Sequence, residues 1–271
     1  MIKTNYHTHM KYCNHAVGDV RDYVEKAIEY GYSELGMSDH APIPVNSMTK
    51  EEWHSNYCNE NMSLDTFNIY LNDIEKCQKE FSNIKIYKGL ESEFLEDYID
   101  HYKYLRSKLD YMILGIHFYK YKGRIINTYE DCNYDTIDGY LDNAIHGMES
   151  GLFNYLAHPE LFFFEYKDKN GKHTFDDKCV EVTKKIIECA IKNNIYLEMN
   201  TNGLKFSNEA DKDNWRYPYS KFWAIAAKYK DLKVIVGVDA HNPVLLNSPW
   251  IKKVLDMAEE YNIKLVEKME F

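Results

Sequence analysis

Short hydrophobic runs alternate with longer amphipathic segments along most of the chain. The runs are rich in β-branched and aromatic residues and have the length of buried strands. Seven segments have this character: residues 3–7, 34–38, 84–91, 111–116, 152–158, 195–200 and 233–239. Because strands separated by helix-length connections are typical of βαβ units, the pattern predicts an α/β protein with a parallel sheet.

The connecting segments have the period of amphipathic helices. In residues 20–30, Tyr23, Val24 and Ala27 fall on one helical face, and Gly31 is a typical C-terminal stop. The same period recurs at residues 64–81, 177–193, 220–229 and 250–261. Seven strands joined in this way favour a barrel over an open sheet.

Two segments interrupt this alternation. Residues 41–83 are too long for one connection and are rich in Asn, Ser, Tyr and Met, while residues 165–173 form a polar, turn-like stretch. The chain contains no internal repeat and no Pro/Gly-rich linker. We therefore expect a single domain over residues 1–271 with inserted loops, and a flap at the rim of the barrel formed by residues 41–83.

The charge balance and the cysteine pattern restrict the partners and the compartment. The 271-residue chain has 33 Lys and Arg residues against 43 Asp and Glu residues, a formal net charge of −10. Such an acidic protein is poorly suited to bind a polyanion, so no nucleic-acid partner is expected. No segment approaches 18 uninterrupted apolar residues, which argues against a membrane partner. The six cysteines form no CxxC pair, so we expect reduced thiols and a cytoplasmic protein. The sequence leaves open whether the protein forms a homo-oligomer.

Histidine and carboxylate residues gather at the ends of the predicted strands. Nine side chains lie at or just past such an end: His7, His9, His15, His40, Glu91, His117, His158, Asp239 and His241. In parallel barrels and sheets, the carboxyl ends of the strands are where sites are assembled. Seven of the 11 histidines share this position, so we expect these side chains to converge.

The spacing of several of these residues also points to metal binding. His7 and His9 are two apart, as are Asp239 and His241. Alternate residues of a strand point to the same side, so each pair can reach one ion.

Two carboxylates near this edge leave alternatives open. Glu93 lies two residues beyond Glu91, and from their spacing either one is a candidate ligand. Asp39 precedes His40 and is a candidate for orienting an imidazole or donating a proton, but a strand-end turn carboxylate is an equally good interpretation.

The ordered set of motifs resembles the PHP phosphoesterases. The motifs are HTH at 7–9, the following His15, SDH at 38–40, the strand-end Glu91, GIH at 115–117, AHP at 157–159 and VDAH at 238–241. The chain length, the N-terminal HxH and the LEMNTNGL segment look most like the histidinol-phosphatase branch of that family. The resemblance implies a distorted (β/α)7 TIM-like barrel, one PHP-type catalytic domain, and three divalent ions described as zinc, manganese or iron.

The resemblance also implies which side chains hold which ion. The first ion would be bound by His7, His9, Glu91 and Asp239, the second by His15, His40 and His241, and the third by Glu91, His117 and His158. Glu91 would then bridge two ions, which favours it over Glu93 as the ligand. Imidazole and carboxylate ligands suit such borderline metals.

The chemistry implied is hydrolysis of a phosphomonoester, with Asp39, Glu91 and Asp239 as catalytic candidates. A hydroxide that bridges two cations attacks phosphorus, while the ions neutralise the phosphoryl oxygens. No protein nucleophile is then needed, and the chain contains neither a GxSxG elbow nor a P-loop pattern.

The substrate predicted is L-histidinol phosphate, an intermediate of histidine biosynthesis. The family tends to place a basic residue after its sixth strand, where this chain has Lys205, and Arg216 is a second candidate for the phosphate. Glu160 and Glu93 are candidates for the amine of the substrate. The aromatic run at 162–164 is interpreted as core packing, with a wall for the imidazole as the alternative.

Three other functions compete with this prediction. The first is action on another small phosphate ester or on a nucleotide phosphodiester. The second is an amidohydrolase-like C–N hydrolase, which is disfavoured because such enzymes would not use His15, Asp39, His40 and the DxH motif. The third is a non-catalytic PHP module, which loss of ligands would indicate, and no loss is evident.

Overall fold

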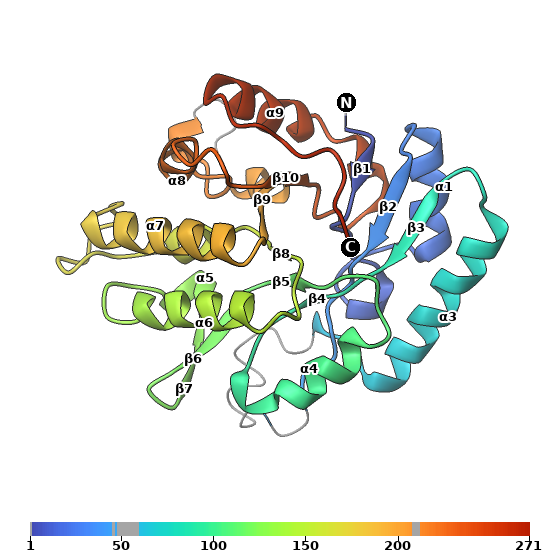
Figure 1. The fold of residues 1–271 in the computed structure, drawn as a ribbon, viewed down its shortest axis with the longest axis horizontal. Helices are drawn as coiled ribbons and strands as arrows, with labels where there is room; N and C mark the ends of the chain where they lie inside the picture. Colours follow the sequence, from blue (N-terminus) through green and yellow to red (C-terminus); the bar gives the residue numbers. More distant parts are fainter. Residues whose placement is uncertain (1, 45–46, 48–59, 208–211) are drawn as a thin grey trace.

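In the described part of this α/β protein, ten strands make up the sheets, and eight of them pair in parallel (Figure 1). The computed structural model describes residues 2–44, 47, 60–207 and 212–271. One parallel sheet contains β1 (Thr4–Asn5), β2 (Glu34–Met37) and β3 (Lys85–Lys88) in that order. A second parallel sheet has the order β4 (Glu91–Ser92), β5 (Ile113–Leu114), β8 (Tyr155–Leu156), β9 (Tyr196–Asn200) and β10 (Val234–Gly237). The predicted α/β class and parallel pairing are confirmed.

Single bridges connect the two sheets at both ends. Thr8 pairs with Ala240 beyond β1 and β10, and His40 pairs with Glu91 beyond β2. The third predicted strand is divided, because its first half, β3, pairs with β2 and its second half, β4, pairs with β5. The strand neighbours therefore follow one another in a ring, with isolated bridges in place of the continuous ladder of a regular barrel.

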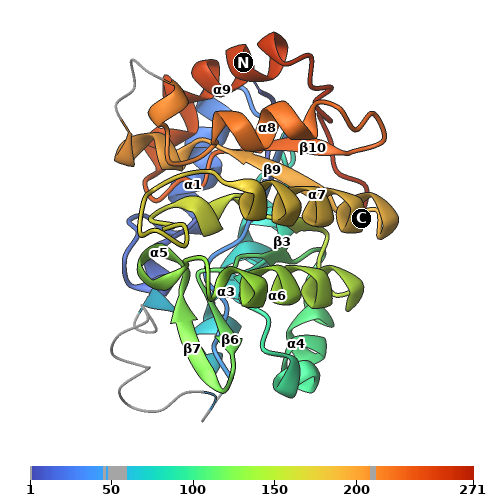
Figure 2. The same ribbon diagram turned by 90° about the vertical axis from the view of Figure 1, so that its left-hand side faces the viewer.

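Helices cover the outside of the strands (Figures 1 and 2). They are α1 (Val20–Glu29), α3 (Leu64–Glu80), α4 (Ile99–Arg106), α5 (Thr128–Asp131), α6 (Ile137–Glu149), α7 (Asp177–Lys192), α8 (Ser220–Ala226) and α9 (Trp250–Glu260). Short 3-10 turns occur at Lys11–Cys13, Glu96–Tyr98, Leu161–Phe163, Asn202–Phe206, Lys212–Asn214 and Pro243–Asn247. None of the helices in the described part of the chain is long and apolar enough to span a membrane.

Local sequence signals fix the ends of the helices that were predicted. In α1, the Asp19 carboxylate accepts hydrogen bonds from the backbone N–H groups of Arg21 and Asp22, and the Asp22 carboxylate accepts one from the N–H of Asp19. This reciprocal capping satisfies N–H groups that a helix start leaves without partners. The face of α1 that carries Tyr23 and Val24 is buried, as the periodicity predicts.

The segment predicted as a rim insertion contains a regular covering helix. Within residues 41–83, α3 packs beside α1 and β3, and Tyr70 of α3 donates a hydrogen bond from its hydroxyl to Gly89 O at 2.9 Å. Residues 64–80 therefore make an ordinary βαβ crossover. Of the rest of that segment, residues 45–46 and 48–59 lie outside the described part of the chain.

Tyrosines close the amino-terminal end of the ring. Tyr6, Tyr111 and Tyr155 are buried inside it, and the hydroxyls of Tyr111 and Tyr155 donate to Tyr6 O at 2.7 and 3.1 Å. A Cβ atom at Gly36 or Gly89 would collide with the ring of Tyr111, so these two positions require glycine. Because this end is filled, a site inside the ring is accessible only from the carboxyl ends of the strands.

Candidate metal centre

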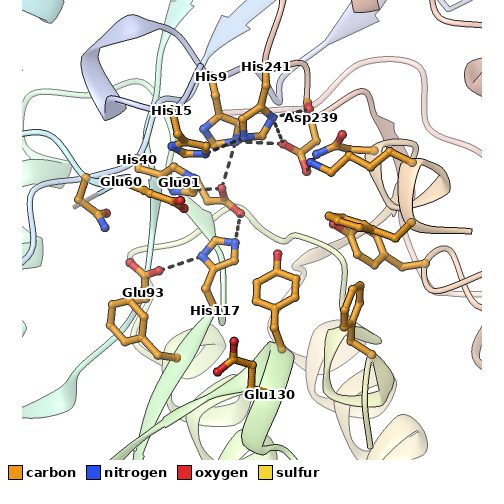
Figure 3. Close-up of a pocket in the computed structure, with 18 of the residues that line it drawn as sticks. His9, His15, His40, Glu60, Glu91, Glu93, His117, Glu130, Asp239 and His241 are labelled. Carbon is orange, nitrogen blue, oxygen red and sulfur yellow. Dashed lines mark hydrogen bonds and ion pairs between the residues drawn. The ribbon is translucent and has the colours of Figure 1, made fainter. Parts of the chain in front are cut away.

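The carboxylate of Glu91 lies at the centre of the histidine-rich edge (Figure 3). The imidazole nitrogens nearest to its two oxygens are those of His7 (Nε2, 3.2 Å), His9 (Nε2, 3.2 Å), His40 (Nδ1, 3.5 Å), His117 (Nε2, 3.5 Å) and His158 (Nε2, 3.1 Å). The first three nitrogens face Oε2 and the last two face Oε1. Glu91 therefore joins two groups of histidines.

Asp239 extends the cluster towards the loop after β10. Its Oδ1 atom lies 3.1 Å from His9 Nε2, 3.6 Å from His7 Nε2 and 3.4 Å from His241 Nδ1. His241 Nε2 in turn lies 2.9 Å from His15 Nε2. All nine side chains singled out in the sequence are thus brought together at one edge of the molecule.

Among the described residues, four groups of donor atoms are compact enough to hold an ion, and three of them resemble the sets implied by the family. These three are His7, His9 and Asp239; His9, His40 and His241; and His40, Glu91 and His117, while the fourth is His9, Cys13 and Asp39. Two of these sets differ from the expected ones: His9 takes the place expected for His15 in the second, and His40 takes the place expected for His158 in the third. His15 is nevertheless in contact with the second set through His241.

The donor atoms fit divalent cations. His7 Nε2 lies 3.0 Å from His9 Nε2, and the nitrogens of His15 and His241 are equally close. Two imidazole lone pairs at this separation repel each other unless a proton or a cation lies between them. Asp239 Oδ1 is buried without a hydrogen bond, so a strong acceptor is left for a further partner. Nitrogen and carboxylate donors together suit zinc, manganese and iron.

Charges within the cluster shift its protonation equilibria. Burial lowers the pKa of His7, but the carboxylates of Glu198, Asp239 and Glu91 outweigh burial and raise this pKa to about 10. Burial and the neighbouring His9 hold the pKa of His241 well below its usual range. The metal-free site therefore holds protons on its inner imidazoles, and a metal ion must displace them.

Two of the nine residues have strained backbones. His158 has a φ of 32° and Asp239 a φ of 52°, in the left-handed region that residues other than glycine rarely adopt. Each such conformation costs about 1–3 kcal/mol and is typical of functional sites. Here the left-handed conformation follows the ends of β8 and β10 and turns the side chains of His158 and Asp239 towards Glu91 and His9.

Buried carboxylates hold the imidazoles from behind. Glu198 Oε1 accepts a hydrogen bond from His7 Nδ1 at 2.7 Å, and Glu93 Oε1 accepts one from His117 Nδ1 at 2.8 Å. Each contact leaves the Nε2 atom of the imidazole free to face the cluster. Asp39 Oδ1 accepts a hydrogen bond from His40 N at 2.9 Å and lies 3.7 Å from His9 Nδ1.

Glu198 was not singled out in the sequence, although a signal was present. It lies in β9 two residues before Asn200, whose side chain donates to Glu198 Oε2 at 2.9 Å and to Asp239 Oδ2 at 3.1 Å. All five residues of β9 are buried. An acidic residue in a fully buried strand needs a polar partner, and this requirement could have identified it.

A cavity of about 460 Å³ opens above the cluster. It is lined by Lys205, as expected for a phosphate contact, and also by Glu60, Glu93 and Glu130. The positive charge of Lys205 contributes to the lowered pKa of His241, which places Lys205 on that side of the cavity.

Two predicted substrate contacts lie elsewhere. Arg216 is not among the residues that line this cavity; its guanidinium donates to Phe164 O at 2.6 Å and pairs with Glu165 at 2.7 Å. Glu160 is fully buried, where it accepts hydrogen bonds from Tyr219 N and Trp223 Nε1. Burial raises the pKa of Glu160 to about 8. The structure thus places Glu160 in the core, because its side chain turns away from the edge that His158 faces.

The fold and the cluster together define an α/β protein with a candidate polynuclear metal centre at the carboxyl ends of parallel strands. The model of the PHP domain family matches residues 5–202, so the chain belongs to that family.

Several relatives of the chain are named as histidinol-phosphatases. The chain is 25% identical to a "Probable histidinol-phosphatase" of Deinococcus radiodurans over 88% of this chain and 85% of the relative. It is 23% identical to the histidinol-phosphatase of Bacillus subtilis over 89% of this chain and 94% of the relative. The solved structure of a histidinol phosphate phosphatase from Lactococcus lactis, in complex with zinc, L-histidinol and phosphate, matches with a TM-score of 0.70 at 18% identity and covers 99% of both chains.

Proposed function

We propose that this protein is a metal-dependent phosphomonoesterase that hydrolyses L-histidinol phosphate to L-histidinol and phosphate in histidine biosynthesis. The observation that carries the proposal is the convergence of eight imidazole and carboxylate side chains around Glu91, next to one cavity. Relatives named histidinol-phosphatase from two bacteria support the choice of substrate.

Three divalent ions are proposed for this site. His7, His9, Glu91 and Asp239 would hold one, His15, His40 and His241 a second, and Glu91, His117 and His158 a third. When bound, such ions neutralise phosphoryl oxygens and lower the pKa of water, which supplies the nucleophile without a protein side chain.

Four further side chains are proposed to position the metal ligands and the substrate. Glu198 and Glu93 fix the tautomers of His7 and His117, and Asp39 orients the segment that carries His40. Lys205 is positioned at the cavity to contact the phosphate. Asp39 is not among the residues that line the cavity, so we assign it to positioning rather than to proton donation.

The segment after β2 is proposed to complete the rim of the single domain. Glu60 and Asn61 line the same cavity as His9 and His40, so the end of this segment lies beside the candidate metals. This supports a cover at the carboxyl edge, with α3 as the covering helix that follows it.

The proposal is tested by metal analysis and a comparison of substrates. We expect two to three divalent ions per chain, and a kcat/KM for histidinol phosphate at least tenfold above those for a nucleoside monophosphate, a sugar phosphate and a short oligonucleotide. If another ester has the highest kcat/KM, the protein is still a phosphoesterase, but its assignment to histidine biosynthesis is wrong. Less than one ion per chain, with no recovery on adding zinc or manganese, would remove the metal centre itself.

A further inference from the structure

A continuous aromatic wall leads outward from the candidate metal centre. Tyr129 is stacked parallel to His117 at a centroid distance of 6.1 Å and an interplanar angle of 4°. Phe164 meets Tyr129 edge-on at 5.1 Å and Phe206 at 5.3 Å. Tyr217, which contacts His158 at 5.6 Å, lies 6.3 Å from Phe164. We call Tyr129, Phe164, Phe206 and Tyr217 the aromatic wall, and all four line the cavity.

The sequence run that supplies Phe164 divides between two roles. Phe162 and Phe163 are buried in the core, whereas Phe164 is half-buried and lines the cavity. Arg216 fixes the position of Phe164, because its guanidinium lies 5.3 Å from the ring centroid and donates to the backbone carbonyl of the same residue. A ring held in this way is a preorganised surface for a flat group.

The charges along the cavity are separated. Lys205 lies near enough to His241 for its charge to lower the pKa of that imidazole, and Figure 3 shows Glu130 on the side away from His241, beyond His117. The Glu93 carboxylate is hydrogen-bonded to His117, and the Glu165 carboxylate is paired with Arg216. The Glu130 carboxylate makes no hydrogen bond or ion pair with any described residue, and it is exposed at the mouth of the cavity. A ligand with a negative and a positive end is therefore oriented by this cavity.

We propose that the aromatic wall and Glu130 form the subsite for the alcohol half of the ester and select a planar group that carries positive charge. The inference rests on the proposed function, since it assigns the phosphate to the metal side. Aromatic faces attract organic cations, and stacking adds to this for a flat ring. A polyhydroxylated sugar offers neither feature, and a nucleoside offers a flat base but no positive charge for Glu130.

The test uses four phosphate monoesters that separate the ring from the charge. Histidinol phosphate has both, phenyl phosphate has only a ring, phosphoethanolamine has only an ammonium group, and glycerol 3-phosphate has neither. The kcat/KM values are measured on the zinc-loaded enzyme for the wild type, Phe164→Leu and Glu130→Gln. Asp135→Asn is the matched control, because Asp135 is an exposed carboxylate five residues away that does not line the cavity.

Each variant is expected to change a different ratio. Phe164→Leu lowers the histidinol phosphate to phosphoethanolamine ratio about tenfold, because leucine keeps the bulk and removes the ring. Glu130→Gln lowers the histidinol phosphate to phenyl phosphate ratio two- to fivefold, less in high salt, because the carboxylate is exposed. Asp135→Asn changes neither ratio.

Two results would overturn the subsite. The first is a Phe164→Leu enzyme with the melting temperature of the wild type in which kcat/KM falls by the same factor for all four esters. The second is that neither Phe164→Leu nor Glu130→Gln changes its ratio of kcat/KM values. Absence of hydrolysis of all four esters by the metal-loaded wild type would instead refute the proposed function, so the two failures are distinguishable.

Discussion

Glu91 and Glu93 are alternate residues of one strand end, yet their surroundings differ. The two oxygens of Glu91 face five imidazole nitrogens at 3.1–3.5 Å, whereas Glu93 accepts a hydrogen bond from the outer nitrogen of His117. We expect Glu91→Ala to abolish metal binding at two positions and to lower kcat at least a thousandfold. Glu93→Ala should lower metal affinity tenfold to a hundredfold, as expected for a carboxylate behind a ligand.

The comparison is made by metal analysis and steady-state kinetics on both variants. Equal losses, or a larger loss for Glu93→Ala, would show that the assignment of the bridging carboxylate to Glu91 is incorrect. The sequence spacing alone could not make this distinction, because it fixes the side of a strand and not the distance to neighbouring strands.

Glu198 is a second positioning carboxylate that the structure reveals. Glu198→Gln keeps the shape of the side chain, but a neutral amide accepts a weaker hydrogen bond from His7 Nδ1 than a carboxylate does, so it favours less strongly the tautomer that leaves His7 Nε2 unprotonated. We expect a tenfold to hundredfold weaker metal affinity, measured by competition with a chromophoric chelator, and kcat recovered at high metal concentration. Glu259→Gln, at an exposed position of α9, is the matched control. Unchanged affinity in Glu198→Gln would leave Glu198 with only a packing role.

The sequence predicted which residues lie at the edge but not where all their side chains point. His7, His40 and His158 follow the carboxyl ends of β1, β2 and β8, which lie in two parallel sheets. Parallel strands bring such ends to one edge whatever the details of packing. Glu160 follows His158 by two residues, yet the positive φ at His158 turns the chain so that Glu160 enters the core beside Trp223. Such a turn has no sequence signature at a histidine.

At the scale of elements, the alternation of hydrophobic runs with amphipathic segments was enough to predict the strands and most of the long helices of the scaffold. Every segment predicted as a strand contains one, and α1, α3, α7, α8 and α9 lie where the helical period indicated. Three helices and a hairpin were missed: α4, α5, α6 and the antiparallel pair β6 (Phe118–Tyr121) and β7 (Arg124–Asn127). The hairpin directly follows His117, so its strands merge in the sequence with the end of β5.

The C-terminal segment is an element whose role the sequence did not indicate. It crosses the base of the ring, where Lys268 pairs with Glu34 at 2.7 Å and the Met269 side chain is buried among tyrosines. Phe271 contacts Tyr6 at a centroid distance of 5.7 Å.

Deletion of residues 268–271 should therefore lower the free energy of unfolding by about 2–4 kcal/mol, from lost apolar burial and from the lost ion pair between Lys268 and Glu34. Urea denaturation measures this change. Glu270→Ala serves as the control because the Glu270 side chain is exposed and its substitution should stay within about 0.5 kcal/mol. A deletion variant with the unfolding midpoint of the wild type would show that the segment does not seal the base.

At the scale of the whole molecule, the candidate centre joins strands that otherwise pair weakly. The sheet of β1, β2 and β3 and the sheet of β4, β5, β8, β9 and β10 are linked by isolated bridges between Thr8 and Ala240 and between His40 and Glu91. The first bridge lies next to proposed metal ligands, and the second is formed by two of them. His7 and His9 come from the first sheet, whereas Glu91 and Asp239 belong to the second. Ions shared between them would act as cross-links where the hydrogen-bonded ladder is interrupted.

Removal of the metals should for this reason destabilise the entire fold. Ions present at a thousand times their dissociation constant contribute about 4 kcal/mol, which corresponds to a fall in melting temperature on the order of 10 °C on chelation for a domain of this size. The pKa of His7, raised to about 10 in the metal-free protein, means that binding releases a proton, so the stabilisation by metal should be larger at pH 8 than at pH 6. Calorimetry of the chelated and zinc-reconstituted protein at both pH values measures this effect, and Glu91→Ala should show little response to zinc. A chelated protein that is free of metal by elemental analysis and yet melts at the temperature of the reconstituted protein would contradict the cross-linking role.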